Sequence, residues 1–301
     1  MAILKNTVIA DSDPISLPMG TTAQRPVNPP EGSMRYNTDL GYTEVWINRS
    51  WGDLANGRAS FLPRNNMQVE LSYDDPASWP GSGSTWFDTS GNDNDFRVDP
   101  AWAEGSGTAG AWNFSNNGDM AKYKTNNTNV PGVVGNNNVT YVVVTRVLNS
   151  TSQWRTLTRG FNPNPDHHVI IESGGWNIGM YDNDGTGFIS TGYSQQRLPG
   201  YPDGYQVMVW RWSTADTASM PTYTININGA AGGIYTASFN NSAGRYNNSF
   251  HSIGGYHSQN SALNTGDQPW GWIKYFAAYS RRLEDNEVQM VTSTLRNRYG
   301  I

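Results

Sequence analysis

Runs of alternating apolar and polar residues fill most of the chain after residue 66. In the clearest run, Met67, Val69, Leu71 and Tyr73 alternate with polar residues, as expected of a strand with one buried face. Further runs of strand length are separated by corners rich in Gly, Asn and Pro. They cover residues 154–158, 168–172, 176–181, 205–212, 223–228, 234–239, 250–255 and 273–279. Many short strands with turns at regular spacing predict a two-sheet antiparallel sandwich.

Two features of these runs predict how the strands are arranged. Residues 139–148 are apolar on both faces, so we expect a central strand that is covered on both sides. Asn228 followed by Gly229 favours a tight hairpin turn, because both residue types adopt positive φ readily.

One helix is expected at the C-terminal end. Four apolar residues fall on one helical face, namely Val288, Val291, Leu295 and Tyr299. Glu284 and Glu287 hold the two positions of a capping box, and both carboxylates suit the positive end of the helix dipole. Gly300 is placed to end the helix.

A smaller pattern precedes the sandwich. Residues 34–37 alternate like a short strand, and residues 42–47 predict a second strand with Val45 and Ile47 on one face and Trp46 on the other. Such a β-meander is too small to bury a core alone. It therefore needs surface from the rest of the chain, from copies of itself or from a larger assembly.

The pattern divides the chain into four parts. Residues 1–18 form an N-terminal arm, residues 19–54 the small β-module, residues 55–65 a linker and residues 66–301 the sandwich. Residues that break regular structure mark the linker.

Composition supports a β-rich protein and excludes several classes of partner. Of 301 residues, 15% are charged and 12% aromatic, with 32 Gly, which is typical of β-structure with many turns. The net charge of −5 argues against a nucleic-acid-binding surface. The absence of Cys excludes disulfides and thiolate metal sites. We expect neither a secretory signal nor a membrane-spanning segment, because no apolar run is long enough.

The small module carries a specific set of residues. It reads Gly20-Thr21-Thr22-Ala23-Gln24-Arg25-Pro26, then Met34-Arg35-Tyr36-Asn37-Thr38, with Trp46 and Trp51 further on. This set resembles a short module that recurs in structural proteins of tailed bacteriophages, among them tail fibres and head fibres. The resemblance implies a protein of the virion surface, on the capsid or the tail, and a homotrimer. The residues that match the module and would attach the chain to other virion proteins are Arg25, Arg35, Tyr36, Trp46 and Trp51.

Three stretches of residues 66–301 carry a second resemblance. They are residues 86–92, which read W-x-D-x-S-G-N, residues 223–229, which end in Asn-Gly, and residues 273–287, a strand that leads into the terminal helix. Together they resemble the concanavalin A-like lectin/glucanase superfamily in its laminin G-like branch. The resemblance implies an all-β jelly-roll sandwich of two antiparallel sheets with one short C-terminal helix.

Catalysis is not expected from the carboxylates. Glycoside hydrolysis needs two carboxylates that face one sugar bond, and catalytic members of the superfamily carry them as Glu-x-Asp-x-x-Glu on one strand. This chain has no such triple. Glu284, Asp285 and Glu287 come closest, but they lie where the helix begins. The sequence therefore predicts a protein that is not an enzyme.

Two loops could hold Ca²⁺ through carboxylates. The first contains Asp88, Asp93 and Asp95, and laminin G-like domains often bind calcium at a sandwich rim, so the resemblance favours it. The second covers residues 182–185. The alternative for both is a plain turn, because Asn, Asp and Gly are the usual turn residues. The adjacent pair His167-His168 should point to opposite faces of a strand and is expected to be solvated.

Exposed aromatic rings beside amide or acidic groups predict sugar binding, since sugar CH groups pack on rings while hydroxyls need polar partners. The candidate residues in loops are Trp79, Tyr181, Asp182, Asn183, Tyr201, Tyr256 and His257. The alternative for each ring is packing in a large sandwich core.

These observations support three functional hypotheses. The first is adhesion: a virion protein, anchored by residues 1–54, whose lectin-like sandwich binds glycans of a host surface or the environment. The second is a capsid or tail decoration protein that stabilises the virion and binds no ligand. The third is a polysaccharide depolymerase, which the missing carboxylate triple disfavours.

Overall fold

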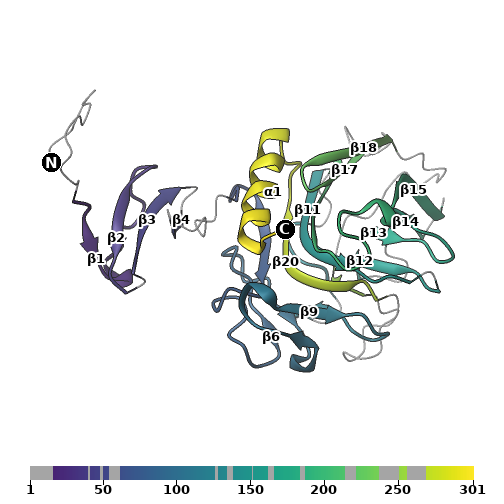
Figure 1. Ribbon diagram of the computed structural model, residues 1–301, viewed down its shortest axis with the longest axis horizontal. Coiled ribbons are helices and arrows are strands. Elements are labelled where there is room, and N and C mark those ends of the chain that lie inside the picture. Colours follow the sequence, from purple (N-terminus) through teal and green to yellow (C-terminus); the bar gives the residue numbers. More distant parts are fainter. Residues whose placement is uncertain are drawn as a thin grey trace. The chain divides into compact units, whose positions relative to one another are not determined.

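The structure is a computed structural model, and it divides the chain into two compact units, Met1–Phe61 and Leu62–Ile301 (Figure 1). The residues that it describes are 16–39, 41–47, 50–53, 62–125, 128–133, 138–150, 152–161, 166–183, 187–213, 222–236, 251–255 and 269–301. Within them, no helix is both long enough and apolar enough to cross a membrane.

The first unit is a small four-stranded sheet. Its strands β1 (Met19–Gly20), β2 (Met34–Asn37), β3 (Tyr42–Ile47) and β4 (Ser50–Asp53) lie in chain order, and a 3-10 turn, η1 (Thr22–Gln24), follows β1. Strands β2, β3 and β4 pair antiparallel, which confirms the predicted meander. Strand β1 adds to it in parallel with β2.

A buried carboxylate, not an apolar cluster, holds this small sheet together. Glu44 is fully buried and lies 2.7 Å from the Arg25 guanidinium and 3.4 Å from that of Arg35. The Asn37 side-chain amide donates a third contact to Glu44 at 3.1 Å. Among the described residues of this unit, Val45 is the one buried apolar side chain.

The second unit is a sandwich of two sheets, each with eight strands among the described residues (Figure 1). The β12 sheet has the order β15-β14-β13-β12-β19-β10-β7-β6, and the β11 sheet has the order β18-β17-β16-β11-β20-β9-β8, with β5 also paired to β20. The elements are β5 (Met67–Ser72), β6 (Thr85–Trp86), β7 (Phe96–Arg97), η2 (Pro100–Trp102), β8 (Ala103–Glu104), η3 (Gly107–Ala109), β9 (Ala111–Phe114), β10 (Ala121–Tyr123), β11 (Asn138–Val147), β12 (Arg155–Arg159), β13 (His167–Ile171), β14 (Asn177–Asp182), β15 (Gly187–Ser194), η4 (Gln195–Arg197), β16 (Gln206–Ser213), β17 (Thr222–Ile227), β18 (Ala230–Thr236), β19 (Ser252–Ile253), β20 (Gly271–Tyr279) and α1 (Asp285–Tyr299).

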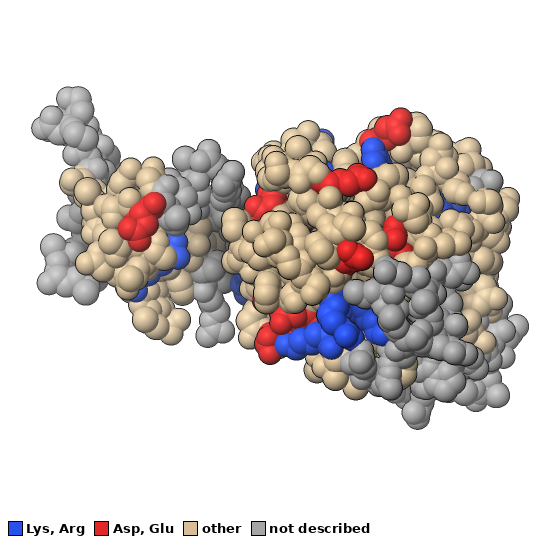
Figure 2. Space-filling view, turned by 90° about the horizontal axis from the view of Figure 1, so that it is seen from below, with Lys and Arg blue, Asp and Glu red and all other residues tan. Residues whose placement is uncertain are grey.

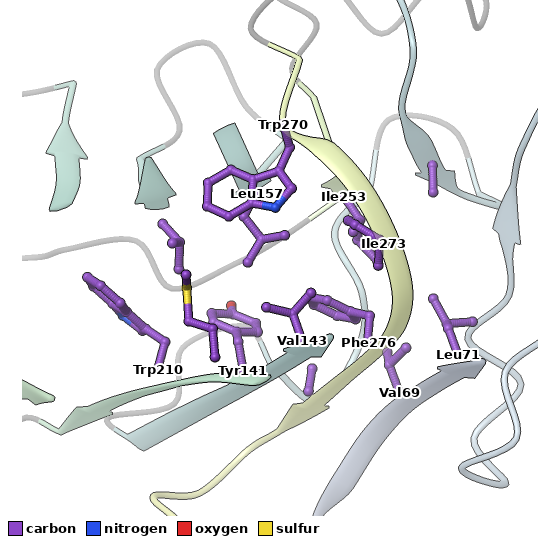
Figure 3. Close-up of a cluster of buried hydrophobic side chains, with 14 of the residues drawn as sticks. Val69, Leu71, Tyr141, Val143, Leu157, Trp210, Ile253, Trp270, Ile273 and Phe276 are labelled. Carbon is purple, nitrogen blue, oxygen red and sulfur yellow. The ribbon is translucent and has the colours of Figure 1, made fainter. Parts of the chain in front are cut away.

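The predicted central strand is confirmed as β11. It pairs with β16 on one side and with β20 on the other. Tyr141 and Val143 point into the core between the sheets, where Leu157 of the β12 sheet meets them (Figure 3). Val142 and Val144 point to the opposite face, into the cluster under α1. Both faces are buried, which is why the strand lacks polar alternation.

The predicted C-terminal helix is confirmed as α1, which covers part of the outer face of the β11 sheet (Figure 1). Val288, Val291 and Leu295 are buried in the cluster beneath it. Its start is capped as expected, because the backbone N–H of Glu284 donates to the Glu287 carboxylate at 2.8 Å. Gly300 ends the helix with φ 65°.

The strand pattern predicted from the sequence was incomplete. Strands β6, β7, β8, β9, β10 and β15 were not predicted, because the first five are short and β15 reads G-F-I-S-T-G-Y-S, in which apolar and polar residues do not alternate. The run at residues 234–239 belongs to β18, which begins earlier, at Ala230, and residues 237–239 lie outside the described residues.

The sandwich surface carries few charges, in keeping with the low charged fraction of the sequence. On the face drawn in Figure 2, most side chains are neither acidic nor basic, and Lys and Arg gather in one patch beside Asp and Glu.

Candidate functional site

A cleft of about 530 Å³ opens beside the loop that follows β5. It is lined by Tyr73, Asp74, Pro76, Trp79, Pro80, Gly81, Pro100, Ala103, Gly105, Ser106 and Gly107. The lining combines two aromatic side chains, three prolines, one carboxylate and the backbone polar groups of a glycine-rich segment. Its volume is in the range that proteins use for small ligands.

The two aromatic residues of the cleft are anchored in the core. Trp79 is 6% exposed, and its ring lies 4.6 Å from that of Trp112 in an edge-to-face arrangement. Tyr73 packs on the same tryptophan at 5.5 Å, and its hydroxyl donates to the carbonyl of Gly105 at 2.9 Å. Trp79 thus packs in the core, which was the alternative for this ring, and it lines the cleft from a buried position. Both rings are rigid, so the wall that they form is preorganised.

The carboxylate of the cleft is fixed by helix α1. Asp74 accepts hydrogen bonds from Arg298 at 2.7 Å and from the Tyr299 hydroxyl at 2.8 Å. Burial alone would raise the pKa of Asp74, but the charge of Arg298 and hydrogen bonds from Arg298, Ser72 and Tyr299 together lower it. Asp74 is therefore ionised at neutral pH, and the last turn of α1 supports the cleft.

Most of the cleft was missed by sequence reasoning. Tyr73 was assigned to a strand, and Pro100, Ala103 and Ser106 belong to a segment without any predicted element. The sequence did contain a signal for the first wall of the cleft, formed by residues 73–81: a turn-rich loop with prolines directly after a strand. No signal linked that loop to the second wall, which comes about 25 residues later along the chain.

The other predicted sugar-binding residues lie in separate groups. Tyr181 on β14 makes edge-to-face contacts with Trp154 at 5.3 Å and with His167 at 5.9 Å. Asn183 follows it, and its backbone N–H donates to Asp166 at 3.0 Å. The side chain of Asp182 lies outside the described residues, as do Tyr256 and His257. Tyr201 packs on Trp176 at 5.9 Å, and its hydroxyl donates to Asn149.

The histidine pair is buried, which corrects the expectation of solvated residues. His167 is 3% and His168 2% exposed, and they point to opposite faces of β13 as predicted. His168 stacks on Tyr141 inside the sandwich, with its Nδ1 atom 2.8 Å from the tyrosine hydroxyl. His167 faces outward against the Thr156 hydroxyl at 2.9 Å. Burial, with the nearby charges of Arg159 and His168, lowers the pKa of His167 well below its ordinary value, so it is neutral at pH 7.

The three aspartates proposed for calcium are engaged by the protein itself. The Asp88 carboxylate accepts hydrogen bonds from three backbone N–H groups at 2.8–2.9 Å. The Lys124 ammonium lies 2.7 Å from Asp93 and 3.4 Å from Asp95. Throughout the described residues, no group of three His, Cys, Asp or Glu is arranged to hold a metal. This geometry favours the turn over the calcium site, because a lysine occupies the place of a cation.

The residues proposed for attachment form the framework of the small unit. Arg25 and Arg35 hold Glu44, and Trp46 packs against Trp51 at 5.6 Å in an edge-to-face arrangement. Tyr36 on β2 is half-buried. These contacts explain why the residues occur together, and they leave the role in attachment a prediction.

Comparison with known proteins supports the fold. No protein-family model matches this sequence, and no curated protein sequence matches it either. Among solved structures, the chain is similar to Trypanosoma rangeli sialidase in complex with sialic acid, with 15% identity, a TM-score of 0.51, and coverage of 75% of this chain and 32% of the sialidase. A mutant of the same sialidase displaying trans-sialidase activity matches with 15% identity and a TM-score of 0.54, over 79% of this chain and 34% of that one.

The ligand-binding domain of botulinum neurotoxin serotype D, in complex with N-acetylneuraminic acid, matches at 14% identity and a TM-score of 0.49, over 76% and 51% of the two chains. The chain thus spans about a third of the length of the sialidases that it matches. At these identities the similarity shows the fold: a concanavalin A-like sandwich of two antiparallel sheets, as the sequence predicted.

Proposed function

We propose that the sandwich binds carbohydrate in the cleft beside Trp79. The cleft itself carries the proposal, because it joins rigid aromatic edges, an ionised carboxylate and the backbone of a glycine-rich segment in a volume of about 530 Å³. Sugar rings need this combination, since their CH groups pack on aromatic and proline surfaces while their hydroxyls take hydrogen bonds.

The fold gives this ligand class additional support. The sialidase structure that the sandwich resembles contains sialic acid, so a chain with a related part binds a sugar. That activity belongs to the sialidase as a whole, of which this chain corresponds to a third. The cleft, and not the similarity, identifies the residues that would contact the ligand here.

Binding without cleavage is part of the proposal. Asp285, one of the three carboxylates that come closest to the catalytic pattern, lies 2.6 Å from Arg211. Glu287 lies 2.6 Å from Arg281 and also caps the helix. Both groups stabilise the start of α1, and this supports the proposal of a structural role for them.

We further propose that the small unit attaches the sandwich to the surface of a phage virion, where the sandwich serves adhesion. The resemblance of residues 19–54 to virion modules supports this. The framework of Arg25, Arg35, Trp46 and Trp51 gives that module a defined structure on which attachment could depend.

A substitution that fills the cleft tests the proposed function. Ser106 is exposed on the cleft wall, in an extended conformation and without a side-chain capping bond, so Ser106→Trp should block the cleft and spare the core. Ser173→Trp, at an exposed turn of the β12 sheet, is the matched control. On a glycan array, we expect the full chain and Ser173→Trp to bind the same sugars and Ser106→Trp to lose them. A full chain that binds no glycan, or Ser106→Trp that binds like the full chain, would contradict the proposal.

A further inference from the structure

An arginine on the outer face of the β11 sheet packs against two aromatic rings. Arg146 of β11 is directly opposite Trp272 of β20 in the strand register. Its guanidinium carbon lies 3.7 Å from the centre of the Trp272 ring and 5.6 Å from that of Tyr205. The guanidinium therefore lies over one ring and close to a second, within the range of cation–π contacts.

Arg146 differs in this from four other half-buried arginines. Arg25, Arg64, Arg281 and Arg298 each meet a carboxylate. Within the described part of the chain, Arg146 makes no hydrogen bond and no ion pair, and its Nε atom is buried without a hydrogen-bond partner. A guanidinium has five N–H donors in a planar fork that fits carboxylates, so this one can take an anion that none of the described residues supplies.

A second cation lies beside the same tyrosine. The Lys274 ammonium is 4.5 Å from the centre of the Tyr205 ring and donates to the carbonyl of Thr108 at 2.5 Å. Burial, partly offset by Asp74, lowers the pKa of Lys274, and the positive charge of Arg146 lowers it further. Two cations thus share one aromatic surface, which raises the local positive potential of a chain that is acidic overall.

The carboxylate beside Trp272 is committed to other partners. Glu104 accepts a hydrogen bond from the indole N–H of Trp272 at 2.9 Å and from the side-chain amide of Asn113 at 2.6 Å. Its hydrogen bond with the indole N–H, at the edge of the Trp272 ring, fixes the orientation of that ring. The guanidinium of Arg146 lies over the face of the same ring.

The arginine and the cleft share a wall. Ala103, Gly105, Ser106 and Gly107 line the cleft, whereas Glu104 and Thr108 of the same segment contact Trp272 and Lys274. Residues 103–108 therefore face the cleft on one side and the group of Arg146, Tyr205, Trp272 and Lys274, here named the cationic shelf, on the other. A sugar chain in the cleft would need to cross only this segment to reach the shelf.

We propose that the cationic shelf binds the anionic group, a carboxylate or a sulfate, of an acidic glycan whose neighbouring sugar occupies the cleft. The proposal rests on the proposed function and adds the ligand class: acidic, not neutral, oligosaccharides. Arg146 makes the paired contacts to the anion, Lys274 adds charge, and Trp272 and Tyr205 hold the guanidinium in place.

Substitution of Arg146 tests this assignment. The full chain, Arg146→Gln and Arg146→Lys are titrated with sialylated, uronic-acid-containing and sulfated oligosaccharides, each beside its neutral counterpart. We expect Arg146→Gln to bind the acidic members at least about 10-fold more weakly and the neutral members unchanged, because a paired charge-assisted contact is lost. Arg146→Lys should fall in between, since lysine keeps the charge but not the planar fork. Arg197→Gln, at an exposed arginine of η4, is the matched control.

The possible outcomes separate the two proposals. Equal binding of acidic glycans by the full chain and Arg146→Gln would overturn the shelf while leaving the cleft intact. Absence of any glycan binding by the full chain would remove both proposals. Competition by inorganic sulfate at the same concentration as the glycan would show a simple anion site and would also overturn the shelf. Melting temperatures of all variants within a few degrees of each other would show that the fold is unchanged.

Discussion

The two units of this chain use opposite chemistry to hold their strands together. In the small unit, the buried centre is the Glu44 carboxylate with two arginines and an asparagine around it. In the sandwich, the centre is aromatic, and fully buried side chains such as Trp86, Trp112 and Trp210 fill the space between the sheets. A four-stranded sheet cannot enclose enough apolar volume for such a core, so the small unit satisfies its strands with a charge network.

The surfaces of the two units also differ, in the number of large apolar side chains that they expose. Among the described residues, the exposed large apolar side chains are Met19 at 69%, Val27 at 89%, Met34 at 45% and Phe87 at 41%. Three of the four belong to the small unit, although it is by far the shorter. The sandwich has buried its apolar residues, whereas the small unit still presents some of them, which is expected of a module that pairs with further surface.

The first prediction concerns a substitution that should unfold the small unit and leave the sandwich folded. Glu44→Ala removes the carboxylate and leaves Arg35, which is 5% exposed, as a buried charge without its counter-ion. Loss of one partner of a buried pair costs about 3–5 kcal/mol, so the small unit should unfold. Hydrogen exchange should then be fast in β2 and β3 and unchanged in β11 and β20. Loss of protection in both units would show that they do not fold independently.

The counterpart in the sandwich is Leu295→Ala. Leu295 is 1% exposed in the cluster under α1, and removal of such a side chain costs about 2–5 kcal/mol. The melting temperature of the sandwich should fall clearly, with the exchange of β2 and β3 unchanged. Arg296→Ala, one residue further on the exposed side, should change it little. Equal shifts for the two substitutions would show that α1 does not dock through Leu295.

A second prediction uses pH to separate the units. Burial lowers the pKa of His251 from its ordinary value of 6.5 to about 4; the Thr128 carbonyl raises it, and the charges of Lys122 and Arg97 lower it further. The unfolded chain therefore binds this proton at a higher pH than the folded chain does. The contribution of neutral His251 to the free energy of unfolding is fully present above pH 6.5. It is lost as the pH falls towards 4, and it amounts to at most about 3 kcal/mol.

Thermal unfolding of the sandwich should accordingly become easier between pH 6.5 and 4.5, and His251→Gln should reduce this dependence. The four histidines of the chain all lie between residues 167 and 257, so the small unit lacks this contribution. The same pH dependence in His251→Gln as in the full chain would show that His251 is not its cause.

The contrast also explains what could be predicted from the sequence. Strand β11 and helix α1 were predictable because their apolar residues repeat with the period of one element and make a continuous buried face. The cleft and the shelf were not, because they depend on contacts such as Arg298 with Asp74, which are 224 residues apart. Arg146 meets Trp272 only through the register of β11 and β20, which local patterns do not contain.

The last prediction concerns the exposed apolar residues of the small unit and has the smallest effect on folding. We expect the chain to self-associate through them, as a trimer, because a sheet with an ionic core and an apolar surface is stabilised by partner surface. Val27→Ser combined with Met34→Ser should weaken association at micromolar concentration in analytical ultracentrifugation. The free energy of unfolding should change by no more than about 0.5 kcal/mol, since both residues are already exposed. Phe87→Ser, the corresponding change in the sandwich, should leave association unchanged. A full chain that is monomeric under these conditions would contradict the prediction and would leave a larger assembly as the partner of the small unit.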